Sequence, residues 1–249
     1  MPDQPKTIEP EVESVSGQPG GESLEVDFLH EIGGLLAAAE PLEKVLAQIV
    51  EFLYEMIGPD SVFIYVLEGD ELVLRASKNP NSEVVNRLKL RVGEGITGWV
   101  AEHREPAAMA RNAAKDPRFL SFSELAEDSY EAFLSVPMVS RGDLVGVINL
   151  QHRLPHMHTR REIALVATIS HLVGSEVSLA RLDEQVTELS DQLETRKLVE
   201  RAKGLLQRDL GLSEEESYLT LQRQSRQRRI TMKQVAEAIV LSDDVRRPK

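Results

Sequence analysis

Apolar residues in the first two thirds of the chain follow first a helical period and then a strand pattern. From Leu24 to Ile57 they recur every three or four positions, which predicts two helices. Two apolar runs then surround Glu68-Gly69-Asp70, and two more surround Arg141-Gly142-Asp143. Strand-forming runs on either side of a short glycine turn are typical of β-hairpins. Between the hairpins we expect a short strand, a glycine-rich turn and a helix from about Thr97.

A long helix follows the second hairpin. Thr159 and Glu162 have the spacing of a capping box, which begins a helix, and no glycine–proline break occurs before Gly211. Within this helix, apolar residues occupy the a and d positions of a heptad repeat. We predict that they form the seam between two copies of the chain, as a coiled coil over residues 179–195; the alternative is one helix that packs on its own domain. The seam residues are Leu179, Leu182, Val186, Leu189 and Leu193.

The last 50 residues predict three short amphipathic helices on one small core. Capping-box spacing recurs at Ser213–Glu216 and at Thr231–Gln234, so two further helices begin there. At the other end, residues 1–22 hold many prolines and glycines with few large apolar groups, which predicts a disordered tail. The predicted fold class is α+β: an antiparallel sheet with flanking helices, a long helix and a C-terminal three-helix bundle.

The distribution of charge divides the chain at residue 196, close to the start of the predicted three-helix region. The net charge is −12, but residues 196–249 hold 13 Lys and Arg against 8 Asp and Glu, whereas residues 1–195 hold 16 against 33. This asymmetry indicates separate roles for the two parts. The chain has no cysteine, which excludes disulfides, Cys-ligated zinc, thiolate catalysis and cofactors attached through a thioether. We find no export signal or membrane segment in the sequence and expect a cytoplasmic protein.

Two patterns invite a chemical interpretation. Gly93-x-Gly95-x-x-Gly98 matches a nucleotide-binding fingerprint, but no catalytic or acidic partner residues follow at the required places, so a tight turn into a helix is favoured. His152, His156 and His158 lie close in sequence, but no acidic residue accompanies them at ligand-like spacing. We therefore expect an exposed loop and no metal site there. No catalytic motif is present, so we predict no enzyme activity.

The segments GEGITGWVAEHREP, RNAAKDPRF and SVPMVSRGDLVGVINLQH, followed by a long helix, resemble the GAF domain family. The resemblance implies a sensor domain over residues 23–178, with a small-molecule pocket on one face of its sheet. Without cysteine, a covalent bilin is excluded and a non-covalent effector stays open. Asn112, Lys115 and Phe119 match part of the motif of cyclic-nucleotide members, but Ser123-Glu124 departs from it. The expected pocket residues are Phe119, Phe122, Tyr130 and Phe133.

On a helical wheel, residues 197–208 separate into an apolar and a basic side. Lys197, Arg201, Gly204 and Arg208 share the basic side, with Lys203 at its flank. A glycine within a basic stripe allows a phosphate backbone to come close, although a charged stripe is by default a solvated face. In the next helix Tyr218 is available to stack on a base, but its phase favours core packing.

KLVERAKGLLQRDLGLSEEESYLTLQRQSRQRRITMKQVAEAIV resembles the ANTAR domain. The resemblance implies a domain over residues 196–242, before a tail over residues 243–249, that binds paired stem-loops in nascent mRNA leaders and prevents transcription termination. The implied partners are RNA, a second copy of the chain and a small-molecule effector, without a membrane. A DNA-binding helix-turn-helix regulator and a protein-only signalling module stay open as alternatives. The expected RNA contacts are Lys197, Arg201, Lys203, Gly204, Arg208, Arg223 and Arg226.

Overall fold

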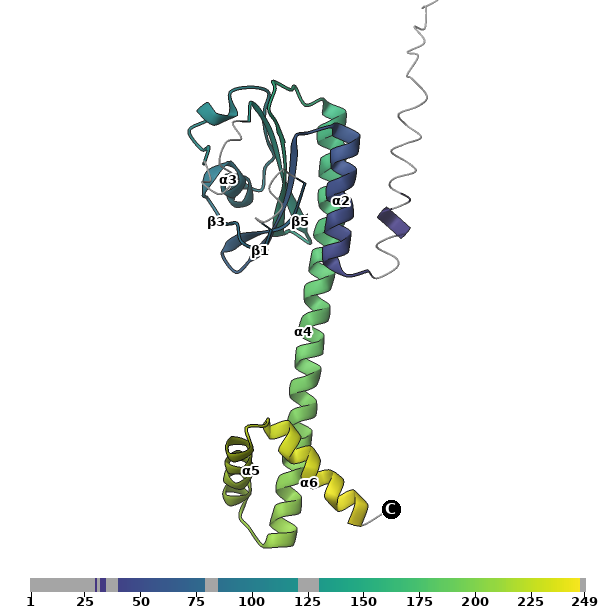
Figure 1. Ribbon diagram of the computed structural model, residues 1–249, viewed down its shortest axis with the longest axis vertical. Coiled ribbons are helices and arrows are strands. Elements are labelled where there is room, and N and C mark those ends of the chain that lie inside the picture. Colours follow the sequence, from purple (N-terminus) through teal and green to yellow (C-terminus); the bar gives the residue numbers. More distant parts are fainter. Residues whose placement is uncertain (1–29, 31, 35–39, 79–84, 121–129, 247–249) are drawn as a thin grey trace, which may run out of the picture. The chain divides into compact units, whose positions relative to one another are not determined.

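The computed structural model describes residues 30, 32–34, 40–78, 85–120 and 130–246. The predicted tail 1–22 and Phe122 lie outside these residues, as does most of the predicted first helix. The chain forms two compact units, residues 1–176 and 177–249, and each is described by itself. Helix α4 (Arg160–Leu210) begins in the first unit and ends in the second (Figure 1).

The first unit is built on a six-stranded antiparallel sheet with the order β3-β2-β1-β6-β5-β4. The two predicted hairpins form its centre and are joined to each other through β1 and β6. The predicted antiparallel sheet with flanking helices is therefore confirmed. The strands are β1 (Ser61–Glu68), β2 (Glu71–Lys78), β3 (Lys89–Arg91), β4 (Ala107–Met109), β5 (Ala132–Ser140) and β6 (Asp143–His152).

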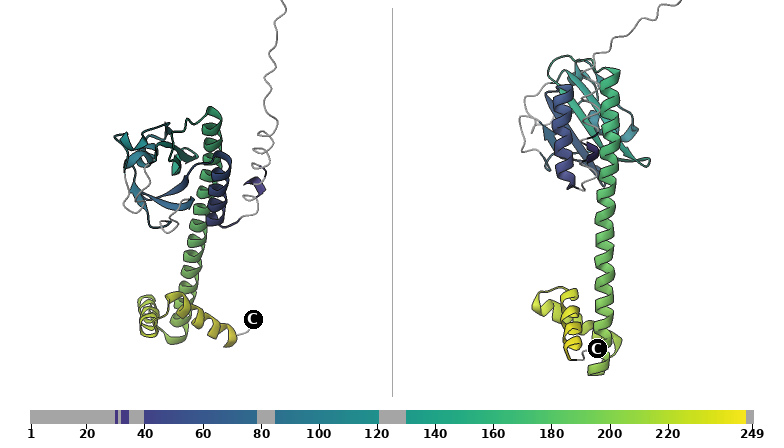
Figure 2. Two further views of the ribbon diagram at one scale, coloured as in Figure 1. Left: turned by 45° about the horizontal axis from the view of Figure 1, so that its top comes forward. Right: turned by 90° about the vertical axis from the view of Figure 1, so that its right-hand side faces the viewer.

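Helices cover the two faces of the sheet. Helix α2 (Leu42–Ile57) and the first part of α4 lie side by side on one face, as Figures 1 and 2 show. The α4 side chains on this face are Val166, Ile169 and Val173, all fully buried. The shorter α3 (Gly95–His103) lies on the opposite face, where Ile96 and Val100 join a second core with Phe63 and Phe133. A short 3-10 turn, η2, spans Ala113–Lys115.

The glycine fingerprint is a structural turn. Gly93 and Gly95 have positive φ angles of 87° and 68°, which favour glycine. At Gly98, a Cβ would lie 2.5 Å from the Arg91 carbonyl oxygen, so the backbone packs too closely for a side chain. The three glycines thus lead from β3 into α3, which confirms the prediction of a tight turn.

By length and composition alone, α4 would suffice to cross a membrane. Its apolar residues in the first unit have another explanation, since Val166, Ile169 and Val173 are buried against the sheet. Gly174 lets the helix come close to the sheet, because a Cβ there would meet the Val139 carbonyl oxygen at 3.3 Å. This part of α4 is a core helix of its unit.

The second unit packs the end of α4 with α5 (Glu214–Arg228) and α6 (Met232–Arg246), as predicted. All three capping boxes are formed, at Thr159–Glu162, Ser213–Glu216 and Thr231–Gln234. Helix α6 runs four residues beyond the predicted boundary at residue 242. The core of the unit holds Ala202, Leu205, Leu221, Val235, Ala236 and Val240.

Candidate nucleic-acid interface and sensor face

The predicted basic stripe lies on the exposed side of α4. Lys197, Arg201, Gly204 and Arg208 are all exposed, while Ala202 and the other apolar residues of the same turns face the core. A Cβ at Gly204 would meet nothing within 4 Å. The glycine is therefore not required by packing inside the unit, and it leaves the stripe open to close approach by a ligand backbone.

The two arginines of the stripe pair with acidic residues near the end of α6. Arg201 Nη2 donates to Asp244, and Arg208 Nη2 donates to Asp243 Oδ1 at 2.6 Å. Arg208 also donates to its neighbour Asp209 at 2.7 Å, and the hydrogen bonds to Asp209 and Asp243 raise the pKa of its guanidinium. Asp243 and Asp244 are therefore paired with the basic stripe, although the sequence analysis placed them in a tail.

Lys203 differs from the other predicted contacts. Its side chain is buried, and its Nζ donates to Glu214 at 2.7 Å and to Glu200 at 3.1 Å. The hydrogen bonds to Glu214 and then to Glu200 raise the pKa of the ammonium. Lys203 thus connects α4 with the first turn of α5, and it is less available to an external phosphate than the exposed stripe.

Helix α5 adds two exposed arginines, Arg223 and Arg226. Ser217 and Leu221 fill the inner positions of this helix, which leaves Tyr218 43% exposed. The prediction that Tyr218 packs in the core is therefore wrong. Its ring lines a groove of about 1120 Å³ whose other walls carry Glu188, Asp191 and Glu200. These carboxylates repel phosphates and make the groove a poor place for nucleic acid.

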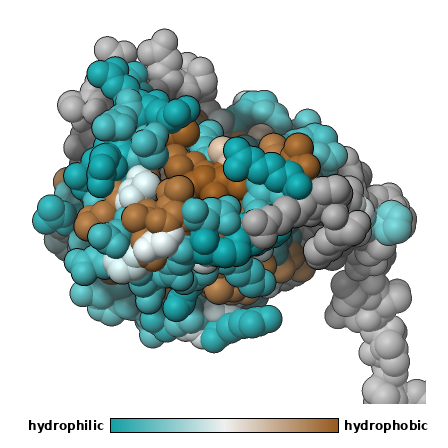
Figure 3. Space-filling model, turned by 90° about the horizontal axis from the view of Figure 1, so that it is seen from below, coloured by the Kyte–Doolittle hydropathy of each residue, from teal (hydrophilic) through white to brown (hydrophobic). Residues whose placement is uncertain are grey.

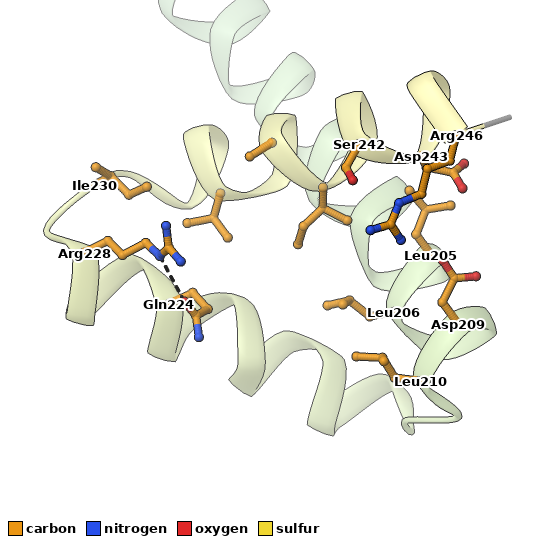
Figure 4. A pocket seen from close by; sticks show the side chains of 13 residues that line it. Leu205, Leu206, Asp209, Leu210, Gln224, Arg228, Ile230, Ser242, Asp243 and Arg246 are labelled. Carbon is orange, nitrogen blue, oxygen red and sulfur yellow. Dashed lines mark hydrogen bonds between the residues drawn. The ribbon is translucent and has the colours of Figure 1, made fainter. Parts of the chain in front are cut away.

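A second groove of about 520 Å³ lies among the three helices (Figure 4). Leu206, Leu210 and Ile239 give it an apolar floor, and Arg228, whose Nε donates to Gln224 Oε1 at 3.2 Å, lies beside it. Figure 3 shows an apolar area framed by hydrophilic side chains on the face seen from below. Apolar surface of this kind is typical of contacts with other macromolecules.

The predicted seam is a row of exposed apolar side chains on α4. Their exposed fractions are 52% for Leu179, 45% for Leu182, 64% for Val186, 58% for Leu189 and 58% for Leu193. Within the part of the chain that the structure describes, no other element covers this row. A heptad stripe left open in this way is suited to a second helix of the same kind.

In the first unit, two of the predicted pocket residues, Phe119 and Phe133, lie on the face of the sheet that carries α3. Phe133 is buried in that core and Phe119 packs against it. Tyr130 is also buried, with its hydroxyl 2.6 Å from the Ser61 hydroxyl. Burial strongly raises the pKa of Tyr65, which belongs to the same core and stays protonated.

The same face carries polar residues that the sequence analysis missed. Ser135 donates to Asn149 Oδ1 at 2.7 Å, and Asn149 Nδ2 donates to Thr97 at 2.7 Å. Gln151, two residues further along β6, has a buried Oε1 without a hydrogen-bond partner among the described residues. Asn149 and Gln151 alternate with apolar residues in INLQH, and this alternation was the available signal. Buried groups of this kind are suited to recognising a small polar ligand.

The three histidines are brought together, contrary to the expectation of an exposed loop. His152 is buried at the end of β6, and its ring stacks on that of His156 at 4.0 Å between centroids. Burial is the first cause that lowers the pKa values of His152 and His158, the latter to about 4. An acidic residue does accompany them, because Glu162 Oε1 lies 3.2 Å from His156 Nε2. The spacing hid this contact because it crosses from the loop to the first turn of α4.

Two family models match the chain: the GAF domain over residues 41–177 and the ANTAR domain over residues 187–240. The transcriptional regulatory protein PdtaR of Mycobacterium tuberculosis is 45% identical over 76 residues, which are 30% of this chain and 37% of that protein. The Nif-specific regulatory protein of Azospirillum lipoferum is 26% identical over 171 residues, 66% of this chain and 27% of that protein. The chain therefore matches less than half the length of these relatives.

Among solved structures, the GAF domain of a phosphoenolpyruvate-protein phosphotransferase from Coxiella burnetii matches the first unit. The TM-score is 0.60 at 30% identity, over 65% of this chain and 96% of that one. The match supports a GAF fold for the first unit.

Proposed function

Since the chain belongs to the GAF domain family and carries an ANTAR domain, we propose that it is a transcription antitermination regulator that binds RNA. The observation that carries this proposal is the exposed stripe of Lys197, Arg201, Gly204 and Arg208 on the ANTAR unit. Cationic side chains on one helix face suit the phosphate backbone of a folded RNA, and Gly204 lets that backbone approach. Lys197, Arg223 and Arg226 are exposed and complete the contact surface.

The proposed target is a pair of stem-loops in the leader of a nascent mRNA, bound by two ANTAR domains in one dimer. The exposed apolar row from Leu179 to Leu193 supplies the surface on which two chains associate. Two linked binding modules raise the effective concentration of the second contact, so paired stem-loops bind more tightly than a single one. Nascent mRNA places this activity in the cytoplasm.

The GAF domain is the proposed sensor of the regulator. Its α3-side core combines apolar groups with Asn149, Ser135 and the unpartnered Oε1 of Gln151, which suits a small, non-covalently bound polar effector. We propose signalling rather than catalysis for this face, because the chain has no cysteine for the thiol chemistry of the reductase type of GAF protein. Because α4 starts in this unit and ends in the RNA-binding one, it is the element that transmits the signal.

The decisive experiment compares the affinity of the full chain for a two-stem-loop leader RNA and for duplex DNA across a salt series. We expect tighter binding to the RNA, with affinity falling as salt releases counterions. Lys197→Glu and Arg223→Glu should weaken binding, and each lost phosphate contact should reduce the salt slope by about 1. Arg141→Glu is the matched control, since Arg141 is an exposed cation in the β5–β6 turn of the other unit.

The alternatives predict different results in the same assay. Tighter binding to duplex DNA would favour a helix-turn-helix DNA regulator. No binding to either nucleic acid would favour a protein-only signalling module that uses its apolar groove. RNA binding that Lys197→Glu and Arg223→Glu leave unchanged would reject the assigned surface.

A further inference from the structure

A cluster of three histidine side chains lies where β6 ends and the chain leads into α4. His152 is the last residue of β6, and His156 and His158 lie in the loop before Arg160. Ring centroids are separated by 4.0 Å for His152–His156, 4.8 Å for His156–His158 and 5.2 Å for His152–His158. One ring nitrogen from each residue lies within 4.8 Å of the other two.

Three ring nitrogens of this cluster have no hydrogen-bond partner among the residues that the structure describes. His152 is 6% exposed, and its Nε2 is buried with no hydrogen-bond partner among the described residues. Both ring nitrogens of His158 are buried and unpartnered in the same sense. Buried polar atoms in folded proteins nearly always have a partner, so three orphaned nitrogens in one cluster require an explanation.

A carboxylate orients the third ring. Glu162 Oε1 lies 3.2 Å from His156 Nε2, and Glu162 Oε2 accepts from the Thr159 backbone N–H at 2.6 Å in the capping box of α4. A carboxylate that accepts from one ring nitrogen leaves the other nitrogen as a lone-pair donor, as in the second shell of many metal-binding histidines. Glu162 thus fixes the ring through which His156 would bind an ion.

We propose that His152, His156 and His158 bind one divalent transition-metal ion of the zinc class, with Glu162 as the orienting carboxylate. Three imidazole donors favour Zn²⁺, Co²⁺, Ni²⁺ or Cu²⁺ and disfavour Mg²⁺ and Ca²⁺, which prefer oxygen. The fourth position is open to water or to an external ligand.

The spacing fits such an ion after small side-chain movements. Tetrahedral Zn–N bonds of about 2.0–2.1 Å place two ligand nitrogens about 3.4 Å apart. The present limit of 4.8 Å between nitrogens requires the rings to close by about 1.4 Å at most. The His152 and His156 rings stack with 11° between their planes, so the His156 ring must also turn to direct a lone pair at a shared ion, which its place on a loop allows.

The ion would fasten the end of β6 to the first turn of α4. Residues 153–159 connect these elements, and the backbone N–H of His156 donates to the Ala110 carbonyl oxygen at 2.9 Å. Metal binding therefore ties the origin of the signalling helix to the sheet. This inference concerns the first unit alone and does not rest on RNA binding.

The test is a titration of the chelator-stripped full chain with Zn²⁺ and with Co²⁺. We expect one ion per chain, submicromolar affinity, a visible Co²⁺ absorption band and a higher melting temperature with metal. His156→Gln and His158→Gln should each weaken binding at least about 100-fold, and the double variant should abolish it. His171→Gln is the control and should bind like the parent, because His171 is exposed elsewhere on α4.

The outcome is decided separately from folding. Circular dichroism of each metal-free variant checks that the variant is folded. His152→Gln is not the main test, because that residue is buried. Metal bound only at millimolar concentration overturns the proposal. So does parent-like affinity in the folded His156→Gln/His158→Gln variant.

Discussion

The basic residues on and beside the stripe differ in their ion-pair partners. Arg201 and Arg208 are held by carboxylates of α6, Lys203 is buried between two glutamates, and Lys197 has no ion-pair partner among the described residues. Gly204 has no neighbour that its missing side chain would touch. A glycine inside a helix lowers stability, so its presence at an unconstrained position indicates a role outside the fold.

Gly204→Gln should therefore separate stability from binding. Glutamine is a good helix former, so we expect the second unit to gain about 1 kcal/mol in unfolding free energy and its melting temperature to rise by a few degrees. The same side chain should hold an RNA backbone away and weaken RNA binding. Thermal unfolding and an RNA titration measure the two effects. Gly98→Ala, in the close turn against Arg91, is the contrasting variant and should lower stability.

At the scale of elements, α6 shows which contacts the sequence periodicity does not predict. The capping box at Thr231–Gln234 depends on neighbours in sequence and was predicted correctly. The pairs Arg201–Asp244 and Arg208–Asp243 join residues far apart in sequence, and they depend on the angle at which α6 crosses α4. A helical wheel represents one helix and does not give this angle. Asp243 and Asp244 were therefore assigned to a tail.

If the stripe binds RNA as proposed, these two aspartates compete with RNA phosphates for its arginines. The Arg201–Asp244 pair is exposed and therefore weak, whereas the Asp243 side chain is only 16% exposed; both pairs must be broken before the arginines can bind phosphate. Asp243→Asn/Asp244→Asn should raise RNA affinity several-fold. Glu215→Gln/Glu237→Gln changes the net charge equally on exposed positions of α5 and α6, without touching the stripe. An equal rise in both double variants would assign the effect to overall charge rather than to the competing pairs.

At the scale of the whole molecule, the order of elements was readable from the sequence, because hairpin turns, capping boxes and apolar periods are local signals. The candidate sites were readable only in part. His156 and Glu162 come together because the loop after β6 runs beside the first turn of α4, and Asn149 meets Thr97 because α3 crosses the sheet. Contacts of this kind follow from tertiary packing, which no single stretch of sequence encodes.

The largest scale concerns the association of two chains. The row from Leu179 to Leu193 is exposed along a single helix, and burying it against a second copy would remove apolar surface from water. Val186→Glu/Leu189→Glu places two charges at consecutive a and d positions, where a partner helix would bury them. We expect the parent to sediment as a dimer and this variant as a monomer at the same concentration.

RNA binding then links this seam to the proposed function. A monomer keeps the stripe of Lys197, Arg201 and Arg208, so its affinity for a single stem-loop should equal that of the parent. Its affinity for the two-stem-loop leader should fall to the single-site value, since the second contact is no longer intramolecular. Thr187→Glu/Ser190→Glu adds the same charge to exposed positions outside the row and should stay dimeric. A parent chain that sediments as a monomer at RNA-binding concentrations would contradict the paired-site mechanism while leaving the single-site interface intact.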